Sequence, residues 1–143
     1  MSGRLLAAAL ILALAAPLLV RADDQDAIDY RQHIMNSLGE HAAAIDMILK
    51  SKVPADDLAA HAKALAVVTA TAKKAFEPKV AGGNAKPEVW ANWSDFAKRL
   101  DALGTATTEL AAAANGGAGA ATQKAFSSLG CKDCHDKYRV PPK

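Results

Sequence analysis

The segment from Cys131 to His135 places two thiols and one imidazole within five consecutive residues near the C-terminus. On a helix, the first and fourth positions of this Cys-Lys-Asp-Cys-His segment lie about one turn apart on the same face. Two thiols in that arrangement can each add to one vinyl group of a single porphyrin. The histidine beside the second thiol is then held close to the iron. C-x-x-C-H is the attachment sequence of c-type haem. The motif therefore predicts one covalent haem c, bonded through Cys131 and Cys134, with His135 as the proximal iron ligand.

Two other kinds of site use a pair of cysteines at this spacing. A thioredoxin-like redox pair requires a βαβ context, which the sequence does not indicate. A structural zinc site requires four Cys or His ligands, and His33, His41 and His61 do not form a second pair at ligand spacing. We therefore favour haem attachment. The remote alternative is a haem-free helical protein with a redox-active or metal-binding C-x-x-C.

The first 22 residues have the layout of a secretory signal peptide. Arg4 gives a positive start, residues 5–20 form an apolar run, and Ala22 is a small residue suited to signal-peptidase cleavage. The apolar run is short for a membrane span of ~20 residues, and Pro17 interrupts it. We expect residues 1–22 to be removed and residues 23–143 to form one mature domain in the periplasm.

The charge balance argues against nucleic acid as a partner. The full chain carries 17 basic and 15 acidic residues, and loss of Arg4 and Arg21 with the signal peptide leaves the two signs equal. A nucleic-acid-binding protein needs a basic face. The sequence also shows no cluster of catalytic acid, base and nucleophile, so we do not expect an enzyme.

The mature sequence, rich in Ala and Leu, predicts four helices. In the first helix the apolar residues recur in steps of three and four, and Arg31 is the one charged member of this stripe. Short connections between four amphipathic helices predict an all-α fold, an antiparallel up-down-up-down four-helix bundle with a C-terminal covalent haem site. The expected helices cover about residues 26–50, 54–76, 87–114 and 120–138.

The sequence resembles the class II cytochromes c, the cytochrome c prime family, over essentially the whole mature chain. The resemblance rests on Tyr30-Arg31-Gln32 with Met35, on residues 82–90, and most specifically on residues 131–139. It implies that Arg31 lies near a haem propionate and that Gln32 contacts the propionate or the haem edge. It also implies that Arg139 lies near the proximal pocket. An arginine on an apolar stripe independently calls for an anionic partner, unless its charged end extends to solvent.

Met35 lies one turn beyond Arg31 on the same stripe and leaves two functions open. In low-spin class II cytochromes a methionine at this position binds the iron. In high-spin members an apolar residue here crowds an empty sixth site. Ligation would favour one-electron transfer to a redox partner protein that the sequence does not identify. An open site would bind nitric oxide or another diatomic gas. A third interpretation is that Met35 only fills the core. Met47 lies about three turns from Met35 along the helix, too far to share its haem face.

The other side chains of the first two helices bear on surface and assembly. His33 and His41 fall off the apolar stripe and are expected to be solvated, whereas His61 is expected to be partly buried. Ile34 and Ile48 also lie off the stripe. They would permit the homodimer that members of the resembling family often form through their first two helices, and they would equally permit a monomer.

Overall fold

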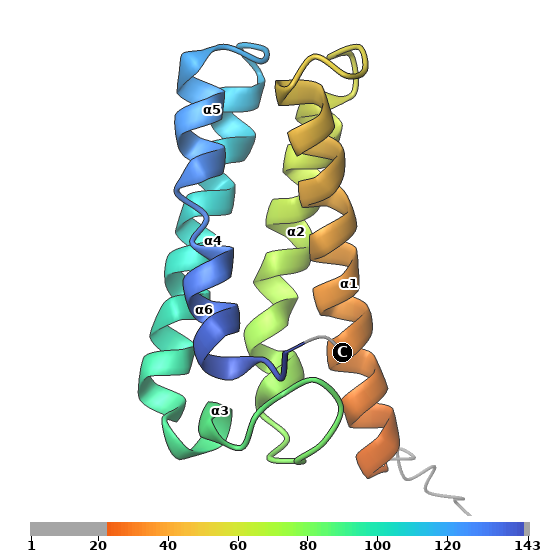
Figure 1. The fold of residues 1–143 in the computed structure, drawn as a ribbon, viewed down its shortest axis with the longest axis vertical. Helices are drawn as coiled ribbons and strands as arrows, with labels where there is room; N and C mark the ends of the chain where they lie inside the picture. The colour runs from red at the N-terminus through yellow and green to blue at the C-terminus, as the bar shows by residue number, and fades with distance from the viewer. Residues whose placement is uncertain (1–22, 142–143) are drawn as a thin grey trace, which may run out of the picture.

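The computed structural model describes residues 23–141, which form a bundle of helices (Figure 1). The helices run alternately up and down, and α5 and α6 follow one another in line to form the fourth helix of the bundle. The predicted antiparallel four-helix bundle is therefore confirmed. The elements are α1 (Asp24–Leu49), α2 (Leu58–Phe76), α3 (Glu88–Ala91), α4 (Trp93–Ala114), α5 (Ala120–Ser127) and α6 (Cys131–Tyr138).

The segment predicted as a signal peptide, residues 1–22, lies outside the described residues. Within residues 23–141, no helix combines the length and the apolar character that crossing a membrane would require.

The first helix begins at Asp24 because Asp23 caps it. The Asp23 carboxylate accepts a hydrogen bond from the backbone N–H of Asp26 at 2.8 Å, and the Asp26 carboxylate accepts one from the N–H of Asp23 at 3.4 Å. Such reciprocal bonds satisfy N–H groups that have no partner within the helix. The second helix begins at Leu58, so the prediction that it starts at Pro54 is wrong. The preceding residues form turns instead, with Ser51 at a φ of 55°.

Two of the predicted helices are each broken once. The helix expected over residues 87–114 is divided at Asn92, whose φ of −118° and ψ of 43° are not helical. Asn competes with the helix by bonding local backbone, and the Asn92 side chain donates to the Glu88 carbonyl at 3.4 Å. The helix expected over residues 120–138 is divided at Gly130, which has a φ of 65°. Glycine accepts this left-handed conformation at little cost, so the cysteine segment begins a new helix.

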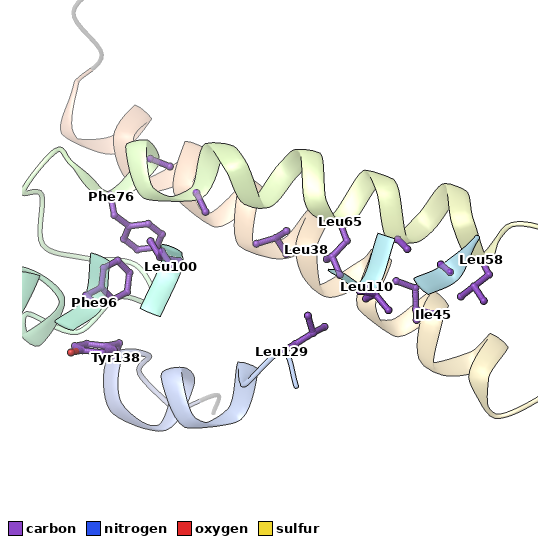
Figure 2. Close-up of a cluster of buried hydrophobic side chains, with 14 of the residues drawn as sticks. Leu38, Ile45, Leu58, Leu65, Phe76, Phe96, Leu100, Leu110, Leu129 and Tyr138 are labelled. Carbon is purple, nitrogen blue, oxygen red and sulfur yellow. The ribbon is translucent and has the colours of Figure 1, made fainter. Parts of the chain in front are cut away.

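Apolar side chains from α1, α2, α4 and α6 fill the centre of the bundle (Figure 2). At the α3 end, Phe76, Phe96 and Tyr138 form edge-to-face pairs with ring centroids 5.0 and 5.1 Å apart. Each such pair adds about 0.5–1.5 kcal/mol beyond the burial of area. The aromatic group thereby joins α2, α4 and α6. The largest aliphatic members of the core are Leu38, Ile45, Ile48, Leu58, Leu65, Leu100, Leu110 and Leu129.

The expectation that Ile48 could serve a homodimer surface is wrong for this side chain. Ile48 is only 4% exposed, and Ile34 packs against the core as well. Both isoleucines contribute to packing within one chain.

The helices do not surround the bundle axis evenly. Extensive packing joins α1 to α2, α2 to α4, and α4 to α5, while α6 packs on α3 and α4. Among the described helices, no comparable packing joins α1 to α6. Ridges and grooves normally hold neighbouring helices of a bundle together, so this side of the bundle has room for something other than a helix.

Candidate functional site

A cavity of about 550 Å³ lies between α1, α2, α4 and α6. Its volume falls within the ~300–1,000 Å³ typical of small-molecule and cofactor sites. Much of the wall is apolar, as a porphyrin face requires, and the ionisable groups belong mainly to α6 and to a few positions on α1 and α4. The main apolar wall residues are Met35, Leu38, Leu65, Phe96, Leu100 and Leu103.

All three residues predicted to hold the cofactor line this cavity. Cys131 and Cys134 are free thiols at the start of α6, and His135 follows them on the same helix. Burial lowers the pKa of His135 below its usual value, the charge of Arg139 adds to this effect, and Asp136 opposes it. The imidazole is therefore neutral near pH 7, the form that can bind a metal ion.

Arg31 is almost completely buried, with 1% of its surface exposed. Its Nη1 donates to the Val80 carbonyl at 2.7 Å and its Nη2 donates to the Gly82 carbonyl at 2.8 Å. The guanidinium carbon also lies 5.1 Å from the ring centroid of Trp90, within range of a cation–π interaction. The anionic partner expected for a buried arginine is thus replaced, at two nitrogens, by carbonyls of the 77–86 loop.

One donor of Arg31 remains without a partner. Its Nε is the one buried side-chain polar atom of the described residues that makes no hydrogen bond. Leaving such a group unpaired costs about 1–3 kcal/mol. Arg31 lines the cavity, so an acceptor bound there could satisfy this N–H. The contact of Arg31 with a haem propionate stays a prediction, and Nε of Arg31 is its expected donor.

The 77–86 loop lies directly against α1 next to Arg31, at Ile28 and Gln32. A Cβ on Gly82 would lie 2.9 Å from Cδ1 of Ile28, and one on Gly83 would lie 2.9 Å from Cγ2 of Ile28 and 3.0 Å from Oε1 of Gln32. Both glycines have positive φ angles, 130° and 57°. Gln32 therefore packs under the loop and also lines the cavity, which fits the predicted contact with the edge of the cofactor.

Met35 lines the same cavity as His135, from the opposite end of the sequence. It is half-buried and packs against the core. Met47 is 43% exposed and does not line the cavity. Met35 is thus the only methionine of the described residues on the cavity wall.

Asp95 supports the site from outside the cavity, and the sequence interpretation missed it. Its Oδ2 accepts hydrogen bonds from the hydroxyl of Tyr138 at 2.5 Å, from Nε of Arg99 at 2.8 Å and from Nζ of Lys137 at 3.0 Å. These donors hold the pKa of the Asp95 carboxyl well below its usual range, with Tyr138 contributing most. The bonds fix the end of α6 to α4. Only the four-residue spacing of Asp95 and Arg99 could have indicated part of this group.

Two backbone hydrogen bonds complete the attachment of α6. The N–H of Lys86 donates to the Tyr138 carbonyl at 2.9 Å, and the N–H of Val140 donates to the Asn84 carbonyl at 2.9 Å. The loop that accepts from Arg31 is therefore also the loop that binds the end of α6. Arg139, placed between these two bonds, is exposed and lines the cavity.

The histidine expectations have mixed outcomes. His33 is exposed, as predicted, and His61 is half-buried, as predicted. The prediction that His41 is solvated is wrong, because it is half-buried and its Nδ1 lies 3.1 Å from Nδ1 of His61. Neither His41 nor His61 lines the cavity.

The residues present fit a covalent haem. Two thiols and a neutral imidazole lie on one wall, apolar side chains form much of the rest, and an unpaired buried N–H on Arg31 can donate to an anionic edge. Residues 26–139 match the family model described as Cytochrome C'. This chain belongs to the cytochrome c' family. Its cofactor is accordingly one covalently attached c-type haem.

Relatives with this fold agree in sequence and structure. The chain is 32% identical to cytochrome c' of Alcaligenes xylosoxydans xylosoxydans over 122 residues, which cover 82% of this chain and 96% of that one. It is also 32% identical to cytochrome c-556 of Agrobacterium fabrum over 119 residues, covering 79% and 80% of the two chains. Recombinant native cytochrome c prime from Alcaligenes xylosoxidans superposes with a TM-score of 0.77 at 31% identity, covering 85% of this chain and 99% of that one.

Proposed function

We propose that this cytochrome c' family protein is a periplasmic one-electron carrier, not an enzyme, in which His135 and Met35 both ligate the haem iron. The observation that carries the proposal is the position of Met35. It is the one methionine of the described residues on the cavity wall, and it lines the same cavity as His135. The secretory layout of residues 1–22 supports export to the periplasm.

Each residue that would hold the haem has its own role in this proposal. Cys131 and Cys134 form the two thioether links, so retention of the cofactor does not depend on binding affinity. When bound, the haem supplies the one-electron redox chemistry. His135 donates a nitrogen lone pair from its neutral ring, and the Met35 thioether favours the reduced iron and raises the potential. Arg31 donates its free Nε–H to a propionate.

The apolar wall serves electron transfer by keeping water from the iron. Leu38, Leu65 and Leu100 lie on that wall with at most 8% of their surface exposed. Burial of this kind is one of the means by which a protein sets a haem potential. Ligation by both His135 and Met35 would also keep the coordination of the iron the same when it gains or loses an electron.

The second candidate function is capture of a diatomic gas. It is favoured by two solved relatives at 30% identity, described as a nitric oxide complex of a mutant of cytochrome c prime from Alcaligenes xylosoxidans and as a carbon-monoxide-bound variant of the same protein. In that case Met35 only packs against the cofactor, and the sixth site of the iron is open to the gas.

Carbon monoxide distinguishes the two functions in the holoprotein. If Met35 ligates the iron, the reduced wild-type spectrum has sharp, split low-spin bands and resists carbon monoxide. The Met35→Ala variant then shows broad high-spin bands and binds carbon monoxide readily. Met47→Ala is the matched control, since Met47 lies on the same helix with 43% of its surface exposed, and it should retain the wild-type spectrum. A high-spin wild-type protein that Met35→Ala does not alter would refute electron transfer by a Met-ligated haem and favour gas binding.

A further inference from the structure

The two half-buried histidines of the α1–α2 interface form a group that the haem site does not use. Nδ1 of His41 on α1 lies 3.1 Å from Nδ1 of His61 on α2, and the ring centroids are 5.4 Å apart with the planes tilted by 53°. Neither ring lines the haem cavity. His41 is in the second half of α1 and His61 in the first turn of α2, so both lie nearer the connection between these helices.

The separation of the two nitrogens suits joint coordination of one metal ion. Imidazole nitrogens bind Zn²⁺ at about 2.0–2.1 Å, so two of them on one ion lie about 2.9 Å apart at a right angle and about 3.4 Å apart at the tetrahedral angle. The observed 3.1 Å lies between these values. By this distance, the two nitrogens can share one ion without α1 and α2 moving apart or closer together.

The positions of the ring protons of His41 and His61 are also compatible with metal binding. In the neutral state one ring donates its Nδ1–H to the unprotonated Nδ1 of the other. When both Nδ1 atoms bind a cation, that proton moves to Nε2 of its own ring. Two coordinate bonds then replace one hydrogen bond, and the neutral pair releases no net proton.

We propose that His41 and His61 form a binding site for a divalent transition-metal ion of the zinc and copper class, which would connect α1 to α2. Imidazole is a preferred ligand for these ions. The described residues contain no group of three or more His, Cys, Asp or Glu side chains that could hold a metal. Water therefore completes the coordination, and the half-exposed position of both rings gives it access.

The holoprotein offers a clean test because few other ligands compete. The chain has four histidines and two cysteines. In the haem-loaded protein both thiols are thioethers and His135 is bound to iron, which leaves His33 as the exposed control on the same helix. Zn²⁺ is the probe, because it has no redox chemistry with the haem.

Calorimetric titration of untagged holoprotein with Zn²⁺ should show one ion per chain. His33→Asn should retain this binding, whereas His41→Asn and His61→Asn should each weaken it at least tenfold. Zn²⁺ should also raise the urea midpoint of the wild type and of His33→Asn, but not of the other two, since a ligand of the folded state alone stabilises that state. The haem spectrum should not change, so this result is independent of whether Met35 ligates the iron.

Three outcomes would overturn the proposal: absence of Zn²⁺ binding to the wild type, equal binding to His41→Asn, or a ratio of one ion to two chains. Should either substitution prevent folding, NMR of the wild type replaces it. Zn²⁺ must then shift the ring signals of His41 and His61 and leave those of His33 unchanged, and any other pattern contradicts the site.

Discussion

Substitution of Gly83 by alanine tests whether the 77–86 loop is held against α1 as the structure shows. Gly83 has a φ of 57°, and the left-handed region costs an L-residue about 1–2 kcal/mol. Alanine also lowers the conformational entropy of the unfolded chain, which offsets about 0.4–1 kcal/mol of this cost. The conformational part alone therefore amounts to about 1 kcal/mol of destabilisation.

Contact with α1 adds a second cost. The new Cβ would lie 2.9 Å from Cγ2 of Ile28, and this methyl is attached directly to a β-branched carbon that has little freedom to move. Overpacking of this kind costs typically about 1–3 kcal/mol. We expect Gly83→Ala to lower the free energy of unfolding by about 2–4 kcal/mol in total.

Gly117→Ala supplies the control for the conformational part. Gly117 also has a positive φ, 85°, but a Cβ there would have no neighbour within 4 Å, so we expect a loss of about 1 kcal/mol from the conformational cost alone. Urea unfolding of the holoproteins, followed by circular dichroism, measures both values, and an unchanged slope shows that the same transition is compared. Equal losses for the two variants would refute the packing of the loop on α1. The double substitution Ile28→Ala with Gly83→Ala should recover part of the contact cost.

Two further predictions concern the attachment of α6 and the core. Because the donors around Asp95 lower its pKa in the folded state, the carboxylate stabilises the protein above its unfolded pKa of about 3.9, and this stabilisation disappears as the pH falls towards the folded value. Urea unfolding should therefore find wild type more stable than Asp95→Asn at pH 6, with the difference shrinking below about pH 4; a difference that stays constant down to pH 2 would contradict the role of the Tyr138–Asp95 bond. In the core, Leu110 has no exposed surface, and Leu110→Ala should cost about 2–5 kcal/mol. Val67→Ala, at a site 61% exposed, should stay within about 0.5 kcal/mol, and similar losses for both would contradict the assigned core.

The bundle and its cofactor could be predicted because both depend on local patterns. Steps of three and four residues reveal which face of a helix is apolar, and short connections then require antiparallel neighbours. The Cys131–His135 segment carries the attachment chemistry within five residues. Such patterns can be recognised without knowing how the rest of the chain folds.

The features that sequence reasoning missed depend on contacts between distant segments. The break at Asn92 lies between Trp90, whose indole N–H donates to the Phe76 carbonyl at 2.9 Å, and Trp93, which packs against the core. The contact of His41 with His61 depends on the register of α1 against α2, which the turns between Leu49 and Leu58 set. Periodicity gives the face on which a residue lies but not its height beside another helix.

Arg31 shows the same limit at the site itself. Its place on the apolar stripe correctly indicates burial, yet the partners that satisfy its two terminal nitrogens belong to a loop about fifty residues later in the chain. A loop carbonyl leaves no mark in the sequence that distinguishes it from any other. From the sequence, a haem propionate and a loop carbonyl are therefore equally possible partners for Arg31.

The intact mass of the natively matured protein shows whether Cys131 and Cys134 carry a covalent haem. We expect the mass of residues 23–143 plus one haem, and fragmentation should place the added mass on the peptide that contains Cys131 and Cys134. A mass without the haem, or a haem that acid-acetone extraction removes, would contradict covalent attachment in the cavity between α1 and α6.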